Sequence, residues 1–87
     1  MQVKRHNPYK QYVEVRADFL LDGRIIPRWF RPEDGEKVII DRVTDMRQAA
    51  SLKAGGQGMR YTCIVNGQEM YLFHDRDEWF AENQSIL

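Results

Sequence analysis

The stretch MRYTCIVNGQEMYLF, residues 59–73, decides the fold class of this 87-residue chain. Its first half alternates, so that one face of an extended strand carries Met59, Tyr61, Cys63 and Val65. Asn66-Gly67 follows, and both of these residues tolerate the positive φ that a type I′ turn requires. The segment therefore predicts a tight antiparallel hairpin whose second strand runs from Gln68 to Phe73.

The same period of two recurs toward the N-terminus. Between residues 12 and 21, one face carries Val13, Val15, Ala17, Phe19 and Leu21. Asp22-Gly23 predicts a second type I′ turn, which leads into a strand from Arg24 to Phe30. Pro27 lacks a backbone N–H, so this strand is expected to lie at a sheet edge or to carry a bulge.

The rest of the chain adds two more expected strands and the connections around them. Residues 31–35 have the proline and glycine of a loop, a third strand runs from Lys37 to about Arg47, residues 74–77 form a turn, and Glu78–Glu82 is the closing strand. Gln48–Gly58 is expected to be a long connection. Tight turns enforce antiparallel neighbours, because parallel pairing needs a crossover of about a dozen residues. We therefore predict an all-β fold: a small antiparallel meander of about six strands, curled into a barrel or roll of the SH3-like kind.

The length allows one hydrophobic core and hence one domain. Residues 11–82 are expected to form the β domain, with residues 1–10 as a flexible N-terminal arm and residues 83–87 as a C-terminal tail. Burial is predicted for four aromatic residues: Phe19, Phe30, Phe73 and Trp79. Packing at the core or its rim is the expectation for Tyr9, Tyr12, Trp29 and Tyr71, with exposure as the alternative.

The single cysteine, Cys63, has no partner for an internal disulfide and lies in the middle of an expected strand. We predict that it is a buried structural thiol. The sequence shows no signal peptide and no apolar run long enough to span a bilayer. These features favour a cytoplasmic protein without membrane contact.

Thirteen basic and thirteen acidic residues give a formal net charge of zero, which argues against a general polyanion binder. The charges are unevenly distributed. Residues 1–31 carry seven bases and three acids, whereas residues 47–60 carry three bases and no acid. Either neighbouring strands pair these charges, or the chain has a local basic surface.

Catalytic and metal-binding patterns are not recognisable. His6, Cys63 and His74 lack the short spacings of metal ligands, and the group His74, Asp75 and Asp77 falls in a polar turn. The sequence offers Cys63 no neighbouring base that would activate it. We therefore expect no enzymatic activity, no metal and no cofactor.

The glycine-rich segment within residues 47–60 is the candidate binding feature. Its backbone N–H groups and cations could contact an anion or a nucleic acid, or the segment could be a simple connector. Trp29 lies between Arg28 and Arg31, where its ring could stack on a base. The candidate contact residues are Trp29, Arg47, Lys53, Gly55, Gly56, Gly58 and Arg60.

Three segments, from Phe30 to Val43, from Arg60 to Gly67 and from Tyr71 to Trp79, carry a resemblance in their aromatic spacing. They resemble small bacterial domains of unknown function, in which a strand pair Arg-Phe-x-Trp…Tyr-x-Val precedes a hairpin Gly-x-x-Tyr-x-Leu-x-x-Asp…Trp. Some of those domains are encoded beside Y-family translesion DNA polymerases. Here Trp29-Phe30 reverses the first aromatic pair. The resemblance carries over no functional residue, but it implies a role near nucleic acid.

Two functions remain open from the sequence. The first is a non-catalytic interaction domain that binds a protein partner or forms a homo-oligomer, with the Pro27 strand and the short last strand as open sheet edges. The alternative is a nucleic-acid-binding accessory domain in DNA repair or replication, which uses the basic glycine-rich segment 47–60.

Overall fold

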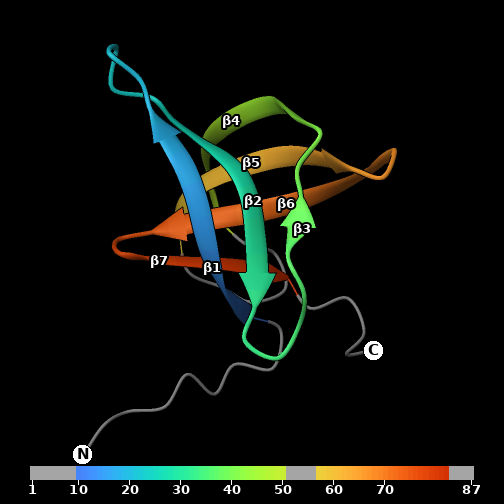
Figure 1. Ribbon diagram of the computed structural model, residues 1–87. Coiled ribbons are helices and arrows are strands. Elements are labelled where there is room, and N and C mark those ends of the chain that lie inside the picture. Colours follow the sequence, from blue (N-terminus) through green and yellow to red (C-terminus); the bar gives the residue numbers. More distant parts are fainter. Residues whose placement is uncertain (1–9, 51–56, 83–87) are drawn as a thin grey trace, which may run out of the picture.

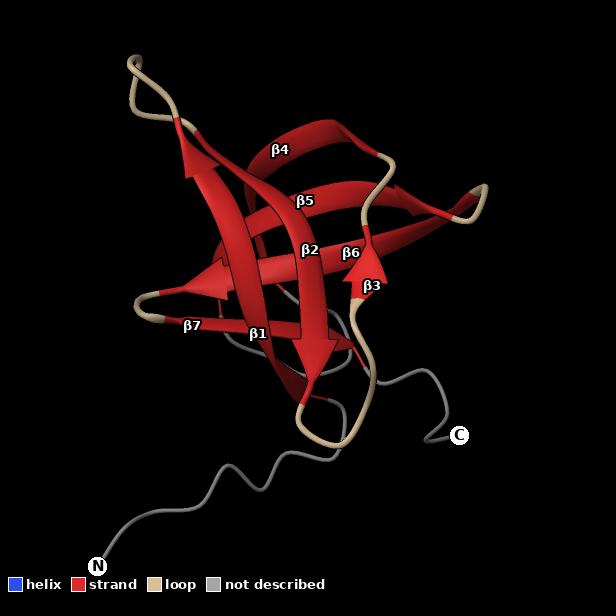
Figure 2. Cartoon of the chain, viewed as in Figure 1, coloured by secondary structure: helices blue, strands red, loops and turns tan. Residues whose placement is uncertain are grey.

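A computed structural model describes residues 10–50 and 57–82, and these residues form seven strands in one antiparallel sheet. The strands are β1 (Lys10–Phe19), β2 (Ile25–Pro32), β3 (Val38–Ile39), β4 (Arg42–Ala50), β5 (Gln57–Val65), β6 (Gln68–Asp75) and β7 (Glu78–Glu82). Their order in the sheet is β3-β2-β1-β7-β6-β5-β4 (Figures 1 and 2). The predicted all-β fold is confirmed. The described part contains no helix, and so no helical segment that could cross a membrane.

The sheet curls until its two ends meet at Ile40 and Asp41. The expected third strand is in fact two strands, because the chain changes its hydrogen-bonding neighbour at these residues. The Ile40 N–H donates to the Arg28 carbonyl of β2 (3.0 Å), and the next N–H, that of Asp41, donates to the Ile64 carbonyl of β5 (2.7 Å). Two consecutive amides thus bind opposite ends of the sheet, which raises the strand number from six to seven and bends the sheet into a half-barrel.

Strand β1 connects the two halves of this half-barrel. Its first residues, Lys10–Tyr12, pair with β7, and the stretch from Val13 to Phe19 pairs with β2. Figure 1 shows β1 and β2 running across β5, β6 and β7. The core lies between these layers, and its buried members are Phe30, Ile40, Tyr61, Cys63, Leu72 and Ala81. The inward face predicted for Met59, Tyr61, Cys63 and Val65 is confirmed.

A second, smaller cluster occupies the other face of β6 and β7. Phe73 and Phe80 are directly opposite each other, and their rings stack with centroids 5.1 Å apart and an interplanar angle of 8°. Tyr12 packs against this pair, and the Lys10 ammonium lies 4.6 Å from the Phe80 centroid. Strands β6 and β7 therefore bury side chains on both faces, as their continuous apolar runs require.

The two predicted turns differ in their geometry. Asn66 and Gly67 have φ of 52° and 79°, so the type I′ prediction holds there. At Asp22-Gly23 it is wrong, because only Gly23 has a positive φ (92°). The Gly23 N–H donates to the Leu20 carbonyl, and the Leu20 N–H donates to the Arg24 carbonyl. This is the pattern of a longer loop, in which glycine takes the left-handed position after a turn.

The burial predicted for Phe19 is also wrong. Phe19 is 78% exposed, and Leu21, predicted to share its face, is fully exposed. Beyond Tyr12, β1 pairs with β2 alone, so the end of this hairpin projects past the sheet, as Figure 1 shows. Phe30 and Phe73 are buried as predicted, whereas Trp79 is half-buried.

The bulge predicted at Pro27 is present. Arg16 pairs with Trp29 while Ala17 pairs with Pro27, which leaves Arg28 as the extra residue of β2. The prediction of an open edge is wrong for the last strand, because β7 lies between β1 and β6. Strand β2 lies between β3 and β1, but β3 pairs only with Trp29 and Phe30, so Pro27 has a strand partner on the β1 side alone.

The long connection predicted at Gln48–Gly58 is shorter than expected, because β4 continues to Ala50 and β5 begins at Gln57. Gly58 is a strand residue opposite Ala49. A Cβ placed on Gly58 would lie 2.5 Å from the His74 carbonyl oxygen and 3.1 Å from the Asp75 Cα. Both are backbone atoms, so close packing of β5 on β6 requires glycine here.

We predict that Gly58→Ala destabilises the domain by about 1–3 kcal/mol, the usual cost of forcing an atom into a packed site. Urea unfolding followed by tryptophan fluorescence measures the change. Gly35→Ala is the matched control, because its new Cβ would meet only the Pro32 side chain, at 3.2 Å or more. Equal unfolding free energies for the two variants would contradict this role of Gly58.

Candidate interaction surface

The outer face of β1, β2 and β3 carries a half-buried tryptophan surrounded by cations. The Arg16 and Arg31 guanidinium carbons each lie 5.6 Å from the centroid of the Trp29 ring, and the Lys37 Nζ lies 4.9 Å from it. Arg16 and Ile39 are the cross-strand partners of Trp29 on β1 and β3. We call this group (Arg16, Trp29, Arg31, Lys37 and Ile39) the Trp29 surface.

Two of the three cations on the Trp29 surface have no carboxylate partner among the described residues. Arg31 is held by Glu14, its cross-strand partner, at 2.6 Å. The nearby Asp18 binds Arg28 at 2.7 Å. Arg16 and Lys37 form no ion pair with any described residue, so the surface has an uncompensated positive charge.

The Trp29 surface also exposes apolar area, because Ile39 is 55% exposed. A half-buried tryptophan with arginines beside it and an exposed aliphatic neighbour is the composition of an energetic centre in protein interfaces. The carboxylates of Glu14 and Asp18 lie on the same face, and each is paired with an arginine.

A second aromatic and basic cluster lies on β4, β5 and β6. Arg47 and Arg60 are directly opposite each other, and the Arg60 guanidinium stacks 4.4 Å from the Tyr71 centroid. Asp45 binds Arg47 at 2.8 Å, and this contact raises the pKa of the arginine. The Nε of Arg60 is buried without a hydrogen-bond partner. The pairing with Asp45 and the stacking on Tyr71 offset the repulsion between the two arginines.

The residues predicted to form one site are therefore distributed. Arg47 and Arg60 are adjacent, and Gly58 lies two positions before Arg60 on β5. Trp29 belongs to β2, in the other half of the sheet. Lys53, Gly55 and Gly56 lie outside the described residues. Sequence reasoning missed Arg16, because the bulge at Arg28 decides which β1 residue faces Trp29. It missed Lys37 because this residue comes near Trp29 only through the pairing of β3 with β2.

The predicted charge complementarity is local. Four ion pairs join described residues, and three of them fall within the first basic segment, 1–31: Asp18–Arg28, Glu14–Arg31 and Asp22–Arg24. Only Asp45–Arg47 joins the acidic segment 32–46, which has five acids and two bases, to the basic segment 47–60. All four pairs are well exposed, so each contributes little to stability.

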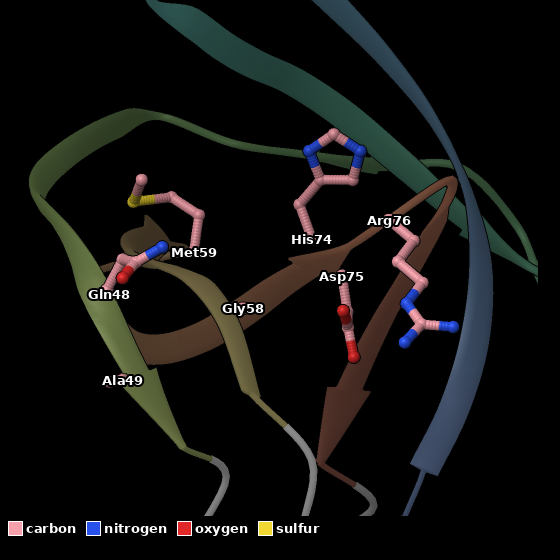
Figure 3. A pocket seen from close by; sticks show the side chains of 7 residues that line it. All are labelled: Gln48, Ala49, Gly58, Met59, His74, Asp75 and Arg76. Carbon is pink, nitrogen blue, oxygen red and sulfur yellow. The ribbon is translucent and has the colours of Figure 1, made fainter.

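A pocket of about 600 Å³ lies between the ends of β4 and β5 and the turn from β6 to β7 (Figure 3). It is lined by Gln48, Ala49, Gly58, Met59, His74, Asp75 and Arg76. Figure 3 shows His74 and Asp75 pointing to opposite sides of their strand. The pocket thus does not pair an imidazole with a carboxylate. Among the described residues, no three His, Cys, Asp or Glu side chains gather to hold a metal.

His74 packs as an aromatic side chain. Its ring stacks on Trp79 with centroids 4.1 Å apart and an interplanar angle of 4°. Burial lowers the pKa of His74, and the carboxylates of Asp75 and Asp77 oppose that shift only in part. The imidazole is consequently neutral at pH 7.

Cys63 is fully buried, as predicted. Its thiol donates to the Tyr61 carbonyl at 3.7 Å, and burial raises the pKa of the thiol to about 12.

We predict that a bulky thiol reagent at pH 8 labels the native protein only as fast as it unfolds. Ile39→Cys, on the exposed β3, is the control and should be labelled at once. Prompt modification of wild-type Cys63 would contradict the burial of this face.

The lowered pKa of His74 predicts that stability depends on pH. The unfolded chain takes up a proton near pH 6.5, whereas the folded chain does so at lower pH. Stability from this group is therefore complete above pH 6.5 and is lost as the pH falls through the folded pKa. His74→Phe, which keeps a ring against Trp79, should make the unfolding free energy less sensitive to pH between 7.5 and 5. Identical pH dependence of urea unfolding in both proteins would refute this origin.

Comparison of the chain with protein family models, curated proteins and solved structures finds no match in any of the three. Its functional interpretation therefore rests on its own residues and geometry.

Proposed function

We propose that this chain is a non-catalytic interaction domain that binds a protein partner through the Trp29 surface. The observation that carries the proposal is Trp29, half-buried, with Arg16, Arg31 and Lys37 within 6 Å of its ring centroid and exposed Ile39 beside it. The fitting partner segment has an apolar side chain for Trp29 and Ile39, and carboxylates for Arg16 and Lys37.

The cations and the aromatic ring act together in this arrangement. Cations above an aromatic face are already partly desolvated and oriented. When they bind a carboxylate, their side chains therefore lose less conformational entropy than the side chain of a free lysine would. Burial of Trp29 and Ile39 supplies the apolar contribution to affinity. Such a domain suits the reducing cytoplasm, because its only cysteine is a buried thiol.

Single-stranded nucleic acid is the second candidate ligand, and the same cations on Trp29 favour it, since bases stack on aromatic rings that lie beside arginine. The exposed Ile39 beside Trp29 weighs against it, because an aliphatic side chain gains little from contact with a phosphate backbone. The two candidates differ in their dependence on salt. Phosphate binding weakens steeply as salt rises, whereas a partly apolar protein interface is less sensitive.

The proposal predicts that peptides rich in Asp, Glu and aliphatic residues bind the chain. A peptide array identifies binders, and fluorescence anisotropy gives their affinities. Trp29→Ala should weaken binding by about 2 kcal/mol, roughly thirtyfold, as expected for an interface centre. Arg16→Glu with Lys37→Glu should abolish the preference for acidic peptides while thermal unfolding changes little, because both charges are exposed.

The matched control is Arg24→Glu with Arg42→Glu, which makes the same change in net charge at exposed positions outside the Trp29 surface. It should leave peptide binding unchanged. A labelled 15-mer of deoxythymidine is titrated at low and at physiological salt in parallel. Peptide binding that resists the Trp29 and Arg16/Lys37 changes would contradict the proposal. Salt-sensitive binding of the oligonucleotide alone, lost in the same variants, would instead establish the nucleic-acid function.

A further inference from the structure

The edge strand β4 carries a charge pattern that complements itself. This strand has β5 on one side and, within residues 10–50 and 57–82, no strand on the other. It is nine residues long, and an edge of that length exposes a row of unpaired backbone groups. Its charged centre reads Asp45-Met46-Arg47.

We propose that β4 pairs with β4 of a second copy of this chain, in an antiparallel register centred on Met46. This surface is separate from the Trp29 surface, so the inference does not depend on the proposed function. In this register the charged centre of each copy, Asp45 to Arg47, is directly paired, and the bulge at Thr44 limits regular pairing beyond it. Asp45 faces Arg47 of the second copy, and Arg47 faces its Asp45.

The pairing to β5 fixes which side chains share a face. Met46 is opposite Tyr61 and packs on the core, whereas Asp45 and Arg47 flank it on the outer face. Direct cross-strand partners lie on one face of the sheet, so the register can shift only by steps that preserve this alternation. A shift by one residue would oppose inner and outer side chains.

The permitted neighbouring registers are unfavourable because of their charges. Centring on Asp45 places this carboxylate opposite its own copy, and centring on Arg47 does the same with two guanidinium groups. Like charges directly opposite are destabilising, and opposite charges are stabilising. Only the register centred on Met46 forms two Asp45–Arg47 pairs, and it also covers the half-buried Met46 with its copy.

The features that usually protect an edge do not block this pairing. Charged residues and bulges discourage unlike strands from adding to an edge. Here the bulge at Thr44 precedes the charged centre, and from Asp45 to Ala50 the pairing with β5 is regular. The Asp45–Arg47 ion pair within each chain (2.8 Å) is exposed, so exchanging the two pairs within the chains for two pairs between them costs little.

Sedimentation equilibrium of the full-length chain tests the inference. Wild type should form a dimer at high micromolar concentration. Asp45→Arg alone and Arg47→Asp alone should each raise the dissociation constant at least tenfold, because each places like charges opposite each other twice. The double exchange, Asp45→Arg with Arg47→Asp, recreates both pairs and should return the constant to near the wild-type value.

A disulfide test locates the symmetry axis. Met46→Cys should oxidise to a covalent dimer, since directly opposed antiparallel residues have Cα atoms about 4.5–5.5 Å apart, within disulfide range. Ile39→Cys, exposed on β3, should not. A wild type that stays monomeric to about 1 mM, a dimer indifferent to the single charge changes, or single-variant losses that the double exchange fails to restore would each overturn the inference. If Met46→Cys fails to fold, the charge-exchange series still decides.

Discussion

The fold depends on two consecutive amides that bind opposite ends of the sheet. The N–H of Ile40 donates to the Arg28 carbonyl of β2, and the N–H of Asp41 donates to the Ile64 carbonyl of β5. Between these two residues the chain passes from the β3 end of the strand order to the β4 end. The sheet must therefore curve until β2 and β5 can each bind one of two neighbouring residues. The Asp41 carboxylate adds a third link by accepting the Asn66 N–H at 3.1 Å, which ties the type I′ turn to the same point. Ile40 itself is buried, so the closure is covered from solvent by core contacts.

The sequence predicted those parts of the fold that depend on neighbours in the chain. The Asn66-Gly67 turn, the strand Glu78–Glu82 and the inward face of β5 follow from local φ preferences and from alternation. The bulge at Pro27 follows from a missing N–H. The division at Ile40–Asp41 was not predictable in this way, because Val38, Ile39 and Ile40 form an ordinary strand sequence. The strand is divided only by the carbonyls of Arg28 and Ile64, which are distant in the chain. Phe19 was misplaced for a similar reason: alternation gives the face of a strand but not where its covering layer ends.

The candidate surfaces show the same division between local and distant information. Trp29 stood out as a residue type, but Arg16 comes to it through a cross-strand register that the bulge at Arg28 sets. The basic character of residues 47–60 was visible, yet Arg47 is held by Asp45 of the preceding acidic segment. Gly58 looked like part of an anion-binding loop, but the space it keeps free is occupied by the backbone of β6. Counting charges along the chain gives the local potential only when the pairing of strands is known.

Barrel closure also determines which surfaces remain for binding. Because Ile40 and Asp41 bind β2 and β5, the chain passes here from the β3 end of the strand order to the β4 end, and β4 is the longer of these two terminal strands. The Trp29 surface lies at the β3 end of the sheet. Strand β3 is only two residues long, yet its pairing with β2 places Ile39 beside Trp29 on the outer face. The change of partner strand at Ile40 and Asp41 thus separates the Trp29 surface, which we propose for an apolar and acidic segment, from the β4 edge, which we propose for a strand. The two surfaces belong to different strands, so the two proposed contacts do not compete for the same residues.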